Sequence, residues 1–350
     1  MDDTYVRIPS SELKQFTIEV LSAAGIPRDD AETEADVLIW ANLRGIDSHG
    51  ILRIPLYLRW IDSGVMKPTP NIQIVNETPA TLMVDADQAL GPVVTTMAMK
   101  KIIDKAKNTG IGWAVIRNIT HQGAMAYYSL MAAEHGMAGI ASVCGIANMA
   151  PFGASAPGVT NSPLAIAVPG GKNRPISLDM ATSVAAGGKL DLAKDKGISI
   201  PSDWALDING QPTTDPHLWN ALMPFGGAKG SGLALMFECL SSIMVGMPLL
   251  HPTESEKDKI KLGMQNSFIG AINISTFTDL NGYLENIDRL IAGLKDLPKS
   301  NGTDEIFVPG EIENRVYDDR SVNGVPLPPG TVTSLRDASE RFDLTLPKGL

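Results

Sequence analysis

Helical and strand-like segments alternate along most of this chain, and that alternation restricts the fold to the α/β class. It starts at Ala89, with a helix expected over 91–107 and a second helix near 124–135. Short apolar segments with strand composition span 111–118, 136–144, 164–168, 176–178 and 268–274. Two amphipathic helices precede the alternation, so the N-terminal region is expected to be a small helical unit.

Two common nucleotide-binding patterns are missing from the sequence. No strand-like segment is followed by G-x-G-x-x-G, the glycine pattern of a Rossmann domain, and no Walker A segment occurs. A standard Rossmann domain is therefore excluded, and the α/β sheet has to be of another kind.

Composition and charge exclude two classes of partner. The formal net charge is −10 and no run of Lys and Arg is available for nucleic-acid phosphates. The apolar stretch 231–250 approaches the length of a membrane span, but Glu238 lies within it, so a buried helix is expected. The first residues, MDDTYVRIPSSELKQ, lack the pattern of a secretory signal. Cys144 and Cys239 lie in apolar surroundings and are expected to be buried free thiols, which favours a cytoplasmic location.

The segment RGIDSHGILR, residues 44–53, concentrates groups that can act on a carboxylate substrate. His49 can take or give a proton near neutral pH, Ser48 can orient its ring, and Arg53 can hold a carboxylate by paired hydrogen bonds. The alternative is a helix cap with a hydrogen-bonded histidine. A helix accepts proline only in its first turn, so Pro55 predicts that the next helix begins just before it, with His49 and Arg53 on the preceding loop and first turn.

Three further turns are candidate binding segments. GGAKGSG at 226–232 combines glycines, a helix N-terminus and Lys229, which suits a phosphate; the alternative is a flexible turn with a solvated lysine. DMATS at 179–183 follows a predicted strand and is expected to open a helix, where Asp179 by itself is best explained as a cap. VPGE at 308–311 carries one acid and is a weak signal alone.

These segments together resemble the type-2 malate/L-lactate dehydrogenase family, nicotinamide enzymes unrelated to the common lactate dehydrogenases. The resemblance is carried, in the family's order, by RGIDSHGILRIPLYLRWIDSG (44–64), THQGA (120–124), NSPLAIAVPG (161–170), LDMATS (178–183), GGAKGSGL (226–233) and VPGE (308–311). It covers most of the chain. It implies a non-Rossmann α/β fold of the malate/L-lactate dehydrogenase type, with a helical domain built from the N- and C-terminal segments. The expected regions are 1–75, helical with the catalytic histidine; 76–275, the α/β cofactor-binding domain; and 276–350, which packs back on the first.

The resemblance also implies roles for residues of this chain. A nicotinamide cofactor, NAD or NADP, would be contacted by Gly123, Ala124, Gly145, Asp179, Met180, Ala181, Lys229, Gly230, Pro309, Gly310 and Glu311. His49 matches the position usually described as the proton donor or acceptor, and His121 matches the one with that role in ureidoglycolate-type members. His49 ranks first because Ser48 and Arg53 lie beside it.

The remaining histidines, His135, His217 and His251, are interpreted as surface or structural residues. No histidine has acids or thiols at metal-ligand spacing, so no metal site is expected.

Two positions bear on the substrate. Many family members read Gly-Thr-Asn-Pro where this chain reads TNSP at 160–163, so Asn161 replaces a substrate-contacting threonine. At Lys189, hydroxy-acid members carry lysine and imine-reducing members carry aspartate. The sequence therefore predicts an NAD(P)-dependent oxidoreductase that interconverts a small 2-hydroxy acid and its 2-oxo acid (malate, lactate, sulfolactate or ureidoglycolate type), with Arg53 and Asn161 on the substrate. The alternative is a cyclic imine (piperideine- or pyrroline-2-carboxylate) reductase. The family's dimeric habit predicts a homodimer.

Overall fold

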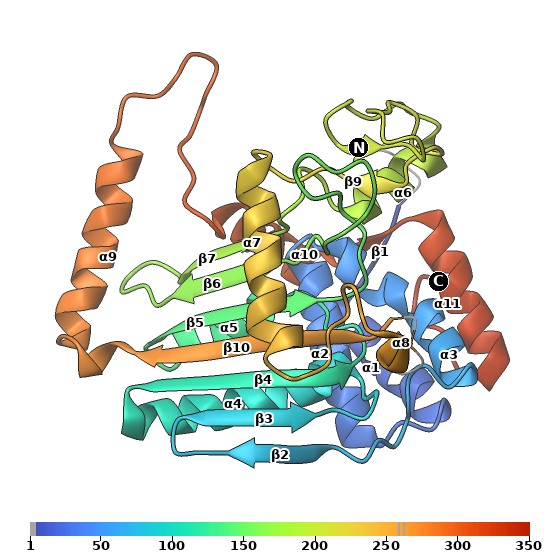
Figure 1. The fold of residues 1–350 in the computed structure, drawn as a ribbon, viewed down its shortest axis with the longest axis horizontal. Coiled ribbons are helices and arrows are strands. Elements are labelled where there is room, and N and C mark those ends of the chain that lie inside the picture. Colours follow the sequence, from blue (N-terminus) through green and yellow to red (C-terminus); the bar gives the residue numbers. More distant parts are fainter. Residues whose placement is uncertain (1–4, 258–259, 262) are drawn as a thin grey trace.

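A computed structural model describes residues 5–257, 260–261 and 263–350. Seven strands of the described residues form one mixed sheet in the order β2-β3-β4-β10-β5-β6-β7 (Figure 1). Strands β3 and β4 run parallel, and the other neighbours in this sheet run antiparallel. The bounds are β2 Gln73–Glu77, β3 Thr81–Asp85, β4 Ile111–Ile119, β5 Met137–Cys144, β6 Leu164–Val168, β7 Ile176–Met180 and β10 Gln265–Asn273. The prediction of an α/β fold without a Rossmann sheet is therefore confirmed.

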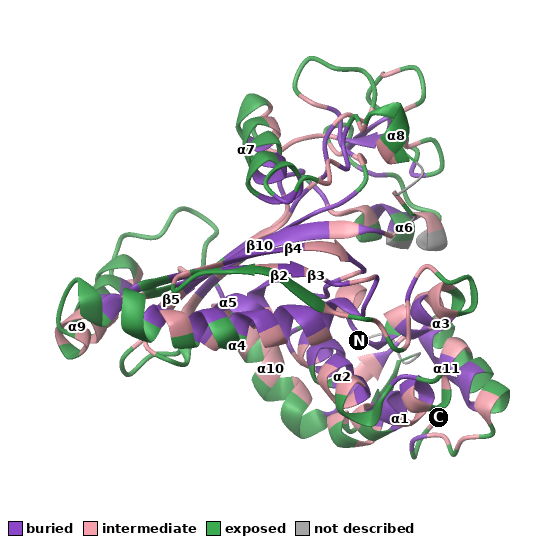
Figure 2. Cartoon of the chain, turned by 60° about the horizontal axis from the view of Figure 1, so that its bottom comes forward, coloured by how far each residue is buried: buried purple, intermediate pink, exposed green. Residues whose placement is uncertain are grey.

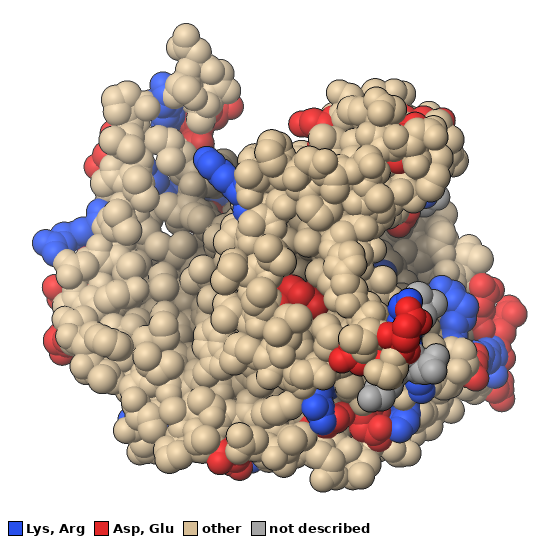
Figure 3. All heavy atoms as spheres, viewed as in Figure 1, with Lys and Arg blue, Asp and Glu red and all other residues tan. Residues whose placement is uncertain are grey.

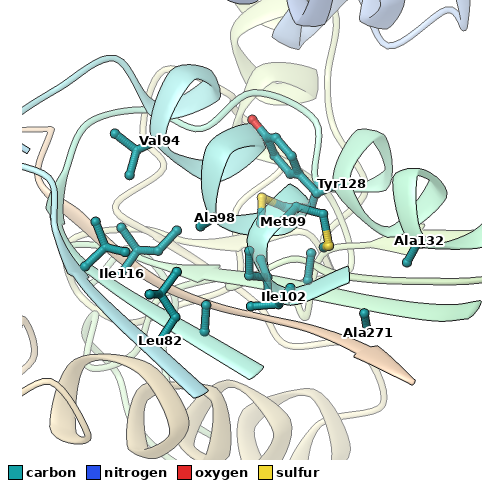
Figure 4. Packing of buried hydrophobic residues seen from close by; sticks show 14 of the residues in the cluster. Leu82, Val94, Ala98, Met99, Ile102, Ile116, Tyr128, Ala132 and Ala271 are labelled. Carbon is teal, nitrogen blue, oxygen red and sulfur yellow. The ribbon is translucent and has the colours of Figure 1, made fainter. Parts of the chain in front are cut away.

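Helices α4 (Gly91–Thr109) and α5 (Ala126–Ala133) cover one face of this sheet. Along α4, the apolar residues Val94, Ala98 and Ile102 recur every four positions, so one side of the helix is apolar and faces the strands. Together with Tyr128 of α5 they form the core between these helices and the sheet (Figure 4). The sheet begins earlier than the sequence indicated, because the hairpin β2-β3 precedes Ala89 and adds the outermost strands.

A separate helical unit forms a second core from both ends of the chain. It consists of α1 (Ser10–Ala23), α2 (Arg28–Leu43), α3 (Ile54–Asp62) and α11 (Pro329–Phe342). Figure 2 shows α1, α3 and α11 side by side, with buried residues on their facing sides. Strand β1 (Val6–Ile8) pairs antiparallel with β11 (Val325–Leu327), which ties the two ends of the chain together.

The remaining elements lie around the sheet. They are η1 (Asp47–His49), η2 (Ile51–Arg53), α6 (Gly187–Lys196), β8 (Ala205–Leu206), β9 (Ala221–Leu222), α7 (Ala228–Glu238), η3 (Cys239–Ile243), α8 (Glu254–Lys257), η4 (Ile274–Thr276), α9 (Leu280–Lys295) and α10 (Glu311–Asn323). A third core, with Met149, Leu190, Leu222 and Ala234, joins α6, β9 and α7.

The apolar stretch expected to be a buried helix is α7 continued by the π-helix η3, and only one of its sides is buried. Phe237 and Glu238 face the sheet and are at most 6% exposed, whereas Leu235 and Met236 are each 53% exposed. Cys239 is likewise exposed, which corrects the expectation of two buried thiols; Cys144 is buried, and both are free. In the described part of the chain, no helix is long and apolar enough to span a bilayer.

Candidate active site

The loop before α3 has the position that was predicted from Pro55. Helix α3 begins at Ile54, and the preceding Ser48, His49 and Arg53 lie on the short turns η1 and η2. Asn42 of α2 anchors these turns, because its Oδ1 accepts from the backbone N–H of Ile51 at 2.8 Å and its Nδ2 donates to Asp47 Oδ1 at 2.7 Å. The loop that carries His49 is therefore held by side-chain hydrogen bonds to the helical unit.

His49 and His121 lie against each other although they are distant in sequence. Their ring centroids are 5.3 Å apart with an interplanar angle of 24°, so the rings stack. Ser48 Oγ lies 2.9 Å from His49 Nδ1, and Tyr57 Oη lies 2.7 Å from His121 Nδ1. Each ring of the histidine pair therefore has the hydroxyl of another side chain within hydrogen-bond distance of its Nδ1.

The tautomer of His121 follows from its second partner. The backbone N–H of Gly123 points to His121 Nδ1 at 3.3 Å, and an N–H group can only donate. Nδ1 therefore carries no proton, the Tyr57 hydroxyl also donates to it, and the ring proton of the neutral histidine resides on Nε2. Nε2 is the nitrogen left to meet a substrate.

Both histidines are neutral at pH 7. Burial, followed by the positive charge of Arg53, lowers the pKa of His49 to about 4. Burial is also the largest cause that lowers the pKa of His121 well below its usual range, with smaller effects from His49 and Arg53. A protonated imidazole is therefore disfavoured at either position.

The two residues predicted to bind substrate differ in how many of their hydrogen-bonding groups are already used within the protein. Arg53 donates through Nε to the Ser48 carbonyl at 2.6 Å, which orients the guanidinium and leaves its terminal amino groups for a carboxylate. Asn161 is paired with Asn148: the Asn161 backbone N–H donates to Asn148 Oδ1 at 2.8 Å, and Asn148 Nδ2 donates to Asn161 Oδ1 at 3.0 Å. This pairing leaves the side-chain amide nitrogen of Asn161 for a ligand.

Asp179 caps a helix, but not the helix expected from the sequence. Asp179 and Met180 are the last residues of β7, and the next helix, α6, starts only at Gly187. The carboxylate instead accepts from the N–H of Ala126, the first residue of α5, at 3.0 Å. Burial raises the pKa of Asp179 to about 6. This bond places the end of β7 beside the loop that carries His121, Gly123 and Ala124.

The glycine-rich turn stands at the start of α7, as predicted. Gly226 and Gly227 both have positive φ, +56° and +60°, so the turn requires glycine before the helix that Ala228 and Lys229 open. Gly230 packs against the backbone of Thr182 and Phe225, with no room for a Cβ. The turn and the residues after β7 therefore form one surface.

The other predicted cofactor residues border the same region. Gly145 donates its N–H to Thr160 Oγ1 at 3.3 Å, next to Asn161. The Pro309 carbonyl accepts from Ser177 of β7 at 3.0 Å, and Gly310, with φ +93°, precedes Glu311, which opens α10. A Cβ at Gly188 of α6 would lie 3.5 Å from Ser48 Cβ, which closes the region toward the histidines.

A nicotinamide cofactor fits these residues. The buried hydroxyls of Ser177 and Thr182 have no protein partner among the described residues, and they lie beside the turns of Gly310 and Gly230. Backbone amides at the start of α7, with Lys229 beside them, suit a phosphate. The backbone of the Gly123 loop lies next to His121, because the Gly123 N–H donates to His121 Nδ1.

Sequence inspection missed Tyr57 and Glu34, although Glu34 carried a signal. It interrupts the apolar side of α2, where the neighbouring positions Ala35 and Leu38 are buried in the core, and an acid there is unusual. His135, His217 and His251 are exposed, as interpreted. No group of possible metal ligands is found in the ranges that the structure describes.

The fold and the family to which the chain belongs place the protein among the dehydrogenases that act on hydroxy acids. It belongs to the malate/L-lactate dehydrogenase family, whose model matches residues 8–336. It is 37% identical over 364 residues to the malate dehydrogenase of Pyrococcus abyssi, covering 100% of this chain and 98% of the relative. It is 41% identical over 312 residues to the L-sulfolactate dehydrogenase of Methanocaldococcus jannaschii, covering 88% and 89%. The crystal structure of malate dehydrogenase from Entamoeba histolytica superposes with a TM-score of 0.93 at 31% identity, covering 98% and 99%. The predicted family and fold are confirmed.

Proposed function

We propose that the protein interconverts a small 2-hydroxy acid and its 2-oxo acid with NAD or NADP, on substrates of the malate, lactate, sulfolactate or ureidoglycolate type. The observation that carries the proposal is the stacked pair His49 and His121 beside Arg53, in a chain of this family. The bound nicotinamide supplies the hydride chemistry. The protein's own residues bind, orient and exchange the proton.

Arg53 is proposed to hold the substrate carboxylate through its terminal amino groups, while Asn161 offers its amide N–H. Both contacts would fix the C2 carbon relative to the histidines, which converts binding energy into alignment of the reacting atoms. Lys229 at the start of α7 is proposed to hold a cofactor phosphate, and Asp179, through its bond to Ala126, keeps β7 aligned with the His121 loop.

The proton exchange is proposed to occur at Nε2 of His121, although the sequence alone ranks His49 first. His121 Nδ1 accepts from both the Tyr57 hydroxyl and the Gly123 N–H, which keeps the ring proton on Nε2, whereas the Ser48 hydroxyl beside His49 Nδ1 can donate or accept and does not fix the tautomer. The neutral Nε2–H of His121 also suits a donor that stabilises negative charge developing on the substrate oxygen. His49 stacks on the reacting ring, and Ser48 orients His49.

The decisive experiment is an assay of purified protein against a panel of 2-oxo acids with NADH and NADPH. The panel includes oxaloacetate, pyruvate and sulfopyruvate, with piperideine-2-carboxylate as the imine competitor, and consumption of reduced cofactor is followed by absorbance. We expect reduction of at least one 2-oxo acid and no faster reduction of the imine. Turnover of the imine alone would replace this function by imine reduction.

A homodimer is proposed on the basis of an uncovered apolar surface. Its residues on α7 and η3 are Leu235, Met236 and Ile243, each 53% exposed, and the adjoining open face of the sheet adds Ile111 (44%) and Ile272 (38%). Figure 3 shows this face largely free of charged side chains. A continuous apolar surface of this kind marks an interface. We propose that a second copy of the chain covers it, and that the protein works in the cytoplasm, where its free thiols stay reduced.

A further inference from the structure

A carboxyl group is buried behind the histidine pair. Glu34 of α2 is 0% exposed, and neither of its carboxyl oxygens has a hydrogen-bond partner among the described residues. A buried polar group without a partner costs roughly 1–3 kcal/mol and more when it is charged. Stability alone therefore gives no reason for a glutamate at this position.

Glu34 faces the loop that carries His121. Val37, three residues further along α2, packs against that loop: a Cβ at Gly123 would lie 2.9 Å from Val37 Cγ1. Residues three apart lie on the same side of a helix, so Glu34 is directed into the same buried region. Burial raises the pKa values of Tyr57 and Tyr128, and an ionised Glu34 would raise both further, so its carboxyl lies within electrostatic reach of the two hydroxyls.

The Tyr57 hydroxyl contacts His121 and lies within electrostatic reach of Glu34. Tyr57 is 0% exposed and donates to His121 Nδ1, because the Gly123 N–H shows that Nδ1 is an acceptor. The hydroxyl oxygen of Tyr57 retains lone pairs that can accept one more hydrogen bond. A protonated Glu34 carboxyl would supply that bond through one ordered water, the usual partner of a buried polar group.

Burial favours the neutral form of Glu34. Burial raises the pKa of Glu34 well above its usual range. The titratable groups on the packed elements are Tyr57 on α3 and Tyr128 on α5, which are neutral at pH 7, with Arg53 on η2 beyond Tyr57. Helix α4 adds no buried titratable side chain to this region, because its lysines and Asp104 are exposed or, for Lys105, paired with Glu77. On α1, which also packs on α2, Lys14 pairs with Asp36, Glu19 accepts from Gln15 and Glu12 accepts from the Lys348 backbone N–H, all near the surface.

We propose that Glu34 is the proton store of the active site, acting on the substrate through Tyr57 and His121. During reduction, the reduced cofactor supplies the hydride and His121 Nε2–H gives its proton to the substrate oxygen. At the same time Nδ1 takes the Tyr57 proton, and the Tyr57 oxygen takes the Glu34 proton through the water. Glu34 ends as a carboxylate and is reprotonated from solvent after product release; oxidation runs the same steps in reverse.

This relay explains why the histidines lie where a charged imidazole is disfavoured. His121 exchanges one ring proton for another and stays neutral throughout, so no buried imidazolium is formed. The negative charge that would otherwise remain on the substrate oxygen moves to Glu34, which makes Glu34 a positioning residue rather than a substrate contact. The inference rests on the proposed function, since it requires a 2-oxo acid as the proton acceptor.

The test compares wild type with Glu34→Gln, which keeps the size of the side chain but cannot store a proton. We expect wild-type kcat for reduction to fall as pH rises through the pKa of Glu34, because the protonated carboxyl is required. Glu34→Gln should lower kcat at neutral pH at least about tenfold, below the full effect of a general acid, and lose that pH dependence. KM and the dissociation constant of the cofactor should change less than about twofold, since these residues do not hold the ligands.

Two further measurements separate this role from a structural one. Infrared difference spectra of the free protein should show a protonated carboxylic acid at neutral pH that is lost in Glu34→Gln. The control Glu238→Gln alters another buried acid, one that accepts from the N–H groups of Leu249 and Leu250, and should leave the pH profile unchanged. Glu34→Leu, which removes the buried polar group, should raise the unfolding midpoint and lower kcat, and it replaces Glu34→Gln if that variant does not fold.

An active wild type whose kcat and pH profile are matched by Glu34→Gln would overturn the inference and leave the proposed function intact. A wild type that reduces no 2-oxo acid would overturn both. An infrared spectrum without a protonated acid at neutral pH would also refute the proton store.

Discussion

Replacing Gly230 by alanine tests how the start of α7 is held against the strand-end residues. A Cβ at this position would press on the Thr182 carbonyl oxygen and lie 2.8 Å from both the backbone N and the backbone O of Phe225. These are backbone atoms already joined to each other: Phe225 N donates to Thr182 O at 3.0 Å, and Gly230 N donates to Phe225 O at 2.9 Å. No flexible side chain can move aside, so the backbone itself has to shift.

The magnitude follows from two opposing terms. Overpacking of a close-packed site costs roughly 1–3 kcal/mol, and alanine in a helix gains about 0.5–1 kcal/mol over glycine. Gly230→Ala should therefore destabilise the protein by about 1 kcal/mol and displace the α7 N-terminus. We expect a dissociation constant for reduced cofactor at least about tenfold higher, which corresponds to about 1.4 kcal/mol.

Urea unfolding followed by circular dichroism and cofactor titration by fluorescence measure the two effects. The matched control is Gly293→Ala in α9, where a Cβ meets no atom within 4 Å. This variant should gain about 0.5–1 kcal/mol from helix propensity and bind cofactor like wild type. The reasoning is refuted if Gly230→Ala is as stable as wild type and binds the cofactor equally well.

Further predictions concern binding, proton transfer, pH and assembly. Lys229→Ala should raise the cofactor dissociation constant more than it lowers saturated turnover, because a phosphate contact acts equally in ground and transition states; an unchanged fluorescence titration contradicts the phosphate role. His121→Ala should lower kcat at least about a hundredfold and His49→Ala less, as steady-state assays will show; the reverse order would return the proton exchange to His49. His49 has a pKa of about 4 in the folded protein against 6.5 unfolded, so its contribution to stability is complete above about pH 6.5 and is lost as pH falls toward 4. The pKa of Asp179, raised from 3.8 to about 6, changes stability with the opposite sign in the same pH range. The test is therefore the difference in unfolding free energy between wild type and His49→Gln, measured by urea unfolding. This difference should change by up to about 3 kcal/mol between about pH 7 and about pH 4. Met236→Lys should convert a homodimer to monomer in light scattering behind a sizing column, and a wild-type monomer would contradict the proposed interface.

Local pattern was sufficient for most elements and for the chemistry of the main loop. The strands β4, β5 and β6 and the helix α4 match their predicted ranges closely, because apolar periodicity depends only on the neighbouring residues. Pro55 placed the start of α3 for the same reason, since a proline acts on its own helix turn. The types of group near His49 were likewise visible as residues in order.

The tertiary structure determined which strands and which site residues lie side by side. Strand β10 enters the middle of the sheet between β4 and β5, an order set by burial and pairing over long sequence separations, which no local period encodes. The same applies to the site: His121 meets His49 only because the sheet and the helical unit pack together, and Asp179 caps α5 instead of the next helix. The residue types show which chemistry is available to the chain. Only the packing determines that Glu34 is buried near Tyr57, because burial and contact are properties of the folded chain.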